Sequence, residues 1–96
     1  MSNYETMIPS TLKVGDTIKY KINFGWSDSE VDTARISVLE PTKTARGKDG
    51  LGQQDQVDWN LVRQNKCMIM LNGSGVNSWI YSEQIIGKIP NPREVV

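Results

Sequence analysis

The sequence contains no histidine and only one cysteine, Cys67. Histidine is the commonest general base and metal ligand, and its absence also removes the usual switch near neutral pH. A single cysteine allows no disulfide within the chain and no multi-cysteine zinc site. Since no histidine is present to activate the thiol, the sequence predicts a buried structural cysteine, with no metal and no other cofactor.

Net charge and long apolar runs are missing as well. Eleven Lys and Arg residues balance eleven Asp and Glu residues, so no net field attracts nucleic acid or an anionic membrane. The longest uninterrupted apolar run is 67–71, far shorter than the roughly 20 residues of a membrane helix. Residues 1–10 have neither the basic nor the apolar region of a secretory signal. We therefore expect one cytoplasmic domain over residues 1–96, with no membrane partner.

Strand patterns dominate what is present. Apolar and polar residues alternate without a break over 17–24, which is typical of a strand with one buried face. A second alternating segment runs from Val31 to Leu39 and ends at Pro41, which cannot donate to a sheet. Val57, Trp59 and Leu61 alternate with polar residues and predict a third strand towards Arg63.

The region 67–81 carries the clearest hairpin signal. Cys67–Leu71 and Asn77–Tyr81 flank the turn sequence Asn-Gly-Ser-Gly at 72–75. With a four-residue loop, Leu71 pairs with Val76, and Met68 lies opposite Trp79. Residues 82–84 then suit a 3₁₀ turn, and Ile85–Ile89 suit a last strand. The segment 41–56 is rich in glycine and basic residues and predicts a long flexible loop.

Five to six short antiparallel strands without a long helix predict an all-β fold, and closure into a small barrel would remove exposed edges. Twelve side chains are expected to point inward: Ile18, Tyr20, Ile22, Ala34, Ile36, Val38, Val57, Leu61, Ile69, Leu71, Ile80 and Ile85. The segments 12–18 and 77–85 resemble the opening strand and the strand, 3₁₀ turn and closing strand of Src-homology-type (SH3-like) small barrels. This resemblance implies an SH3-like barrel. The acidic motif and the turn proline of the peptide-binding members are missing, so the resemblance does not imply peptide binding.

Few groups point to catalysis. Asp28, Glu30 and Asp32 alternate as they would for a hard cation, but the glycine and the final glutamate of an EF-hand loop are absent. A solvated acidic loop is the better interpretation. A filled barrel also leaves little room for a cleft that would tune a carboxylate pair. We therefore expect no enzymatic activity, no catalytic residues and no small-molecule substrate.

The main functional signal is apolar. If Ile69 and Ile80 face the core, the opposite face of the hairpin carries large side chains of types that are enriched at interfaces. The candidate interaction surface comprises Trp26, Met68, Met70, Trp79 and Tyr81. It predicts a non-enzymatic protein-protein interaction or assembly module, with self-association or a place in a larger assembly, such as a virus particle, left open. A cover formed by the loop or by residues 4–8 is the alternative interpretation of this face.

A nucleic-acid-binding barrel is the second functional hypothesis. Its contacts would come from six basic side chains together with exposed aromatics, namely Lys19, Lys21, Arg35, Lys43, Arg46 and Lys48. The neutral balance and the pI of about 6.2 disfavour it. Outward lysines on strands also serve to protect sheet edges.

Overall fold

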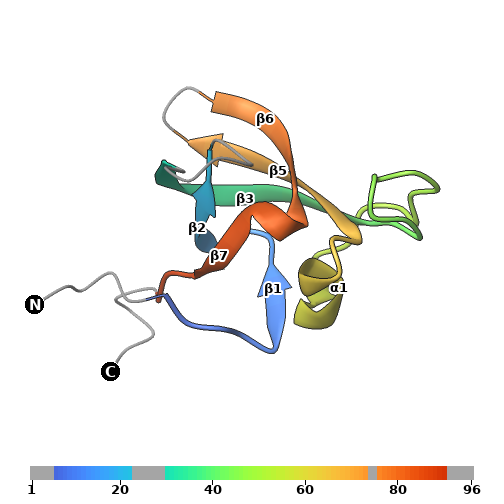
Figure 1. Cartoon of the computed structure of the whole chain (residues 1–96), viewed down its shortest axis with the longest axis horizontal. Coiled ribbons are helices and arrows are strands. Elements are labelled where there is room, and N and C mark those ends of the chain that lie inside the picture. Colours follow the sequence, from blue (N-terminus) through green and yellow to red (C-terminus); the bar gives the residue numbers. More distant parts are fainter. Residues whose placement is uncertain (1–5, 23–29, 74–75, 91–96) are drawn as a thin grey trace, which may run out of the picture.

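The computed structural model describes residues 6–22, 30–73 and 76–90 (Figure 1). Its elements, in chain order, are β1 (Thr11–Lys13), β2 (Thr17–Lys21), β3 (Val31–Pro41), β4 (Gln56–Asp58), α1 (Trp59–Arg63), β5 (Cys67–Gly73), β6 (Val76–Tyr81), the 3₁₀ turn η1 (Ser82–Gln84) and β7 (Ile85–Lys88). The prediction of an all-β fold is confirmed, as are the 3₁₀ turn and the last strand.

The strands form two antiparallel sheets. A five-stranded sheet has the order β6-β5-β3-β2-β7, and β1 pairs with β4 in a two-stranded sheet. The expected closure into a barrel does not occur. Along the described strands, β6 pairs only with β5 and β7 only with β2, so both are sheet edges. The chain passes through η1 from one edge to the other (Figure 1). The resemblance to Src-homology-type barrels stays a prediction.

The core lies on one face of the large sheet, against β1, β4 and α1. Nine of the twelve residues predicted to point inward are buried there. Five further apolar residues are buried in the same core, namely Leu12, Leu39, Trp59, Val62 and Cys67. The prediction was wrong for Ile22, which is 44% exposed because β2 ends at Lys21, one residue earlier.

A β-bulge in β3 explains why Val38 does not point inward as predicted. The pairing of β3 with β5 is regular up to Ile36 and shifts between Ile36 and Val38. The extra residue, Ser37, changes the face that the following side chains present. Leu39 therefore becomes fully buried, whereas Val38, which was predicted to point inward, is half-buried on the opposite face.

The predicted strand from Val57 to Arg63 was wrong beyond Asp58. The Asp58 carboxylate accepts a hydrogen bond from the backbone N–H of Asn60 at 2.9 Å and so caps helix α1. The helix buries Trp59 and Val62, which are three residues apart and lie on one helical face. Leu61, which a strand would have turned inward, is only half-buried.

The hairpin forms with a register two residues away from the predicted one. Leu71 pairs with Ser78, Met70 with Trp79, and Gly73 with Val76. The connection is therefore two residues long, at positions 74–75, and not four. A shift of two preserves the side-chain alternation, so the two predicted faces of the hairpin are kept.

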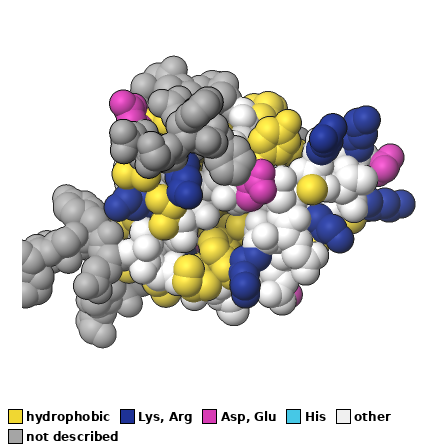
Figure 2. Space-filling model, in the orientation of Figure 1, with side chains coloured by type: hydrophobic (Ala, Val, Ile, Leu, Met, Phe, Trp, Pro, Cys, Tyr) yellow, Lys and Arg dark blue, Asp and Glu magenta, His cyan; other side chains and the backbone are white. Residues whose placement is uncertain are grey.

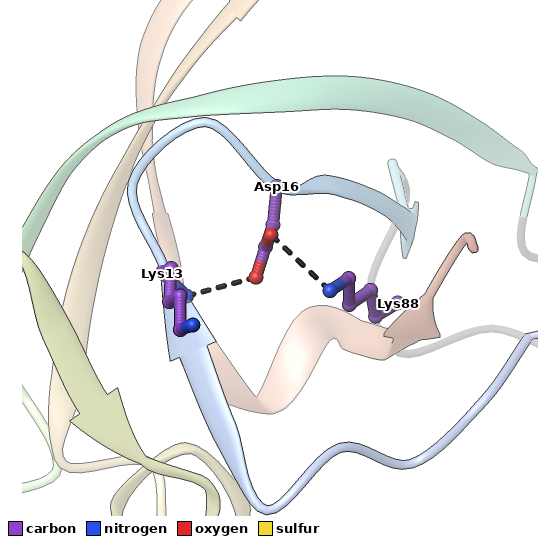
Figure 3. A network of polar contacts seen from close by, with 3 residues as sticks. All are labelled: Lys13, Asp16 and Lys88. Carbon is purple, nitrogen blue, oxygen red and sulfur yellow. Dashed lines mark hydrogen bonds and ion pairs between the residues drawn. The ribbon is translucent and has the colours of Figure 1, made fainter. Parts of the chain in front are cut away.

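Asp16 links the turn between β1 and β2 to strand β7 through a hydrogen bond and an ion pair (Figure 3). One carboxylate oxygen accepts the backbone N–H of Lys13 at 2.9 Å, and the other lies 3.4 Å from Lys88 Nζ. Gly15, with φ of +96°, makes this turn possible. Because the Asp16 and Lys88 side chains are 12% and 14% exposed, the ion pair is largely shielded from water.

Candidate interaction surface

The side of the sheet facing away from the core carries two rows of side chains across β3, β5 and β6. Val38, Met70 and Trp79 are register partners in one row, and Glu40, Met68 and Tyr81 in the other. We call these six residues the outer face. The bulge at Ser37 completes it, because a regular strand would turn Val38 towards the core.

The outer face is mainly apolar and is open to solvent at β6. Trp79 is 43% and Tyr81 42% exposed, whereas Met68 and Met70 are half-buried. Direct cross-strand neighbours have Cβ atoms about 5 Å apart, within reach of favourable methionine–aromatic contacts. Figure 2 shows hydrophobic side chains at the surface over β6, with several Lys and Arg side chains around the loop that follows β3.

Four predicted surface residues, Met68, Met70, Trp79 and Tyr81, are thus brought together on one side of the sheet. Trp26, the fifth, lies outside the described residues. Sequence reasoning missed Val38 and Glu40, since their place on this face depends on the bulge. No local signal identifies that bulge, because Ser37 fits the alternating pattern as well as any polar residue.

The loop after β3 covers only one corner of the outer face. Gly47 has φ of +76°, and a Cβ atom at this position would lie 2.7 Å from Met68 Cγ and 2.8 Å from Met68 Sδ. The described part of the N-terminal segment lies elsewhere: Met7 forms a β-bridge with Lys88, on the edge of β7. Trp79 and Tyr81 therefore keep their exposure.

Isolated β-bridges connect the two ends of segment 41–56 at its base. Thr42 is buried and pairs with Gly50, and Leu39 pairs with Gln54. The backbone N–H of Thr42 also donates to Lys66 at 2.9 Å. These contacts hold the glycine-rich part of the loop beside the Glu40–Met68 row.

An open hollow of about 330 Å³ lies between the loop and the end of β6, lined by Ala45, Arg46, Asn65, Tyr81 and Glu83. Asn65 shapes it by joining two segments: its amide donates to Ala45 O at 2.9 Å and accepts from Glu83 N at 3.1 Å. Its φ of +57° is one that asparagine tolerates better than most residues. Sequence reasoning missed Asn65, because the segment before it was predicted to be a strand and its partners are far away in the sequence.

The basic residues of the nucleic-acid hypothesis form two groups. Lys19, Lys21 and Arg35 occupy β2 and the first half of β3, while Lys43, Arg46 and Lys48 follow the end of β3. The seven residues from Arg35 to Pro41 span about 20 Å of strand. The outer face lies between the two groups, so the six side chains do not make one continuous patch.

Burial shifts the pKa values of Cys67 and Tyr20. Burial raises the pKa of Cys67 to about 11. Glu40 has two opposing effects on this pKa: a hydrogen bond with its backbone lowers it, and its negative charge raises it. The thiol is 1% exposed, which confirms the predicted buried cysteine. Burial, together with the charge of Asp32, also raises the pKa of Tyr20. A neutral, inaccessible thiol is a poor nucleophile and a poor metal ligand.

Within the described residues, no group of three or more Cys, Asp or Glu side chains could hold a metal ion. Asp28 of the acidic triplet lies outside them. None of the described helices is long and apolar enough to cross a membrane. Comparison with protein-family models, with curated proteins and with solved structures gives no match to this chain.

Proposed function

We propose that the chain is a non-enzymatic protein-protein interaction or assembly module that acts through the outer face. The observation that carries the proposal is the exposure of Trp79 and Tyr81, above 40% each, beside Met68 and Met70. Tryptophan and tyrosine are enriched among the residues that dominate binding energy, and methionine is enriched at protein interfaces. A contiguous apolar patch with a polar rim is a typical interaction site, whereas scattered exposed side chains need no explanation.

The chemistry of the partner follows from the composition of the face. Its two rows offer apolar and aromatic contacts with one carboxylate, Glu40, at a corner. A partner surface that is mainly apolar and uncharged at its centre would fit the Met70–Trp79 row. A basic side chain opposite Glu40 would complement the corner.

Paired substitutions test this proposal. Trp79→Ala removes the largest exposed side chain of the outer face, and Ile8→Ala is the matched control. Ile8 is 64% exposed and follows Met7, which is bridged to the β7 edge of the sheet. Cross-linked complexes in the native source should be lost with Trp79→Ala and retained with Ile8→Ala. Equal retention of every complex by both variants would contradict the proposal.

A nucleic-acid-binding role is the second candidate, and one observation favours it. Arg46 and Tyr81 line the same hollow, which would offer a cation to a phosphate and an aromatic ring to a stacked base. Binding to oligonucleotides should then be measurable in dilute buffer and weaken steeply as salt rises. No binding at about 20 μM protein would exclude this role.

A further inference from the structure

The two edges of the five-stranded sheet differ in how they are protected. The β7 edge is covered by the N-terminal segment, because Met7 N donates to Lys88 O at 2.8 Å and Lys88 N donates to Met7 O at 2.9 Å. At the β6 edge, no described strand pairs with β6 on the side away from β5. Natural proteins usually protect such an edge from pairing with another strand by lysine, proline or a covering segment.

Strand β6 carries none of the usual protective residues. Its sequence from Val76 to Tyr81 is Val-Asn-Ser-Trp-Ile-Tyr, without a charged residue or a proline. By contrast, β2, β3 and β7 each contain lysine or arginine. Two copies of β6 can therefore approach each other without repulsion between like charges.

The backbone of β6 offers its free groups at alternate residues. The N–H of Tyr81 points away from β5, because it donates to the side-chain oxygen of Gln84 at 3.0 Å. Backbone direction alternates along a strand, so the N–H and C=O groups of Trp79 and Asn77 point the same way. The Tyr81 N–H is already bonded to Gln84. The backbone N–H and C=O groups of Asn77 and Trp79 are therefore the ones that could pair with another strand.

We propose that the β6 edge pairs antiparallel with the β6 edge of a second copy of this chain. This inference rests on the proposed function and names one partner for the same region. A two-fold axis at Ser78 would place Asn77 opposite Trp79 of the second copy, and Trp79 opposite Asn77. Each of these two residue pairs would exchange two N–H···O=C bonds, giving four hydrogen bonds and one continuous sheet across both copies. The two outer faces would then meet along their Trp79 ends.

Hydrogen exchange tests the geometry without any substitution. Raising the concentration from about 1 μM to about 1 mM should slow the exchange of the Asn77 and Trp79 amides about tenfold or more. The Ser78 and Ile80 amides, which face β5, should be slow at both concentrations. Association without added protection at 77 and 79 would overturn the edge pairing.

A substitution distinguishes edge pairing from association through the side chains. Asn77→Pro removes an N–H that points away from β5, and proline is tolerated on an edge in that orientation. Two of the four hydrogen bonds are lost, each worth roughly fivefold, so the dimer should weaken about twenty-five-fold in sedimentation. Asn77→Ala, the control, keeps the N–H and should change the affinity less than about threefold.

The outcomes separate this inference from the proposed function. If Asn77→Pro folds and dimerises like the wild type while Trp79→Ala does not, the outer face binds and the edge pairing is wrong. A chain that stays monomeric at about 1 mM also overturns the edge pairing. The proposed function is then decided by the cross-linking comparison of Trp79→Ala with Ile8→Ala.

Discussion

Gln84 should be one of the most sensitive polar positions of the fold. The residue is 9% exposed, and its side chain bridges two elements: Nε2 donates to Lys21 O at 2.9 Å, and Oε1 accepts from Tyr81 N at 3.0 Å. These bonds hold the end of β6 to the end of β2, at the point where the chain crosses the sheet. Gln84→Met keeps the length of the side chain and removes both bonds.

The expected loss follows from the two unsatisfied backbone groups. Both hydrogen bonds are part-buried, and each contributes about 1 kcal/mol net. The free energy of unfolding should therefore fall by about 2 kcal/mol, and the melting temperature by roughly 8–16 °C for a domain of this size. Urea titrations and calorimetry measure both quantities.

A matched control isolates the bridging role. Gln53 is exposed, so Gln53→Met makes the same chemical change without removing a buried bridge. It should leave the free energy of unfolding within about 0.5 kcal/mol of the wild type. If Gln84→Met also stayed within that limit, the two hydrogen bonds would not stabilise the crossing, and the reasoning would be refuted.

Three further predictions concern the loop, the helix and the cysteine. Gly47→Ala should destabilise the fold by about 1–2 kcal/mol and shift the methyl resonance of Met68, whereas Gly52→Ala, which has a similar φ but open space around it, should leave that resonance unchanged. Asp58→Ala should cost about 1 kcal/mol in urea unfolding through loss of the helix cap; no measurable cost would contradict the capping role. The pKa of the Cys67 thiol is near 9.0 when unfolded and about 11 when folded, so stability should be fully present below pH 9 and fall by about 2–3 kcal/mol by pH 11. Cys67→Ala should show a shallower decline over that range, and an unchanged slope would refute the assignment.

The parts of the fold that follow from local pattern were predictable. Alternation over 17–21 and 67–81 identifies strands and their faces, because the side-chain period of two is a property of the strand alone. The two faces of the hairpin were therefore right even though its register was not. Register depends on the length of the turn, and Asn-Gly-Ser-Gly permits both a two-residue and a four-residue loop.

The errors arose where distant partners decide the local structure. The bulge at Ser37 becomes visible only when β3 is aligned with β5. The segment after Asp58 satisfies both an alternating and a helical pattern, and burial of Trp59 with Val62 decides between them. Gln84 and Asn65 act through bonds to residues far away in the sequence, so no window around them indicates their roles.

Oxidative footprinting tests most directly whether the outer face is an interaction surface. Hydroxyl radicals should oxidise Trp79 and Tyr81 readily in the dilute purified chain and much more slowly in cells of the native source. Trp59, which is 7% exposed, and Leu51, which is 53% exposed, serve as the buried and open references. Protection of Trp79 and Tyr81 in cells, with Leu51 unchanged, is the predicted result. Equal oxidation of Trp79 and Tyr81 in both settings would mean that nothing covers the face, and the account would be wrong.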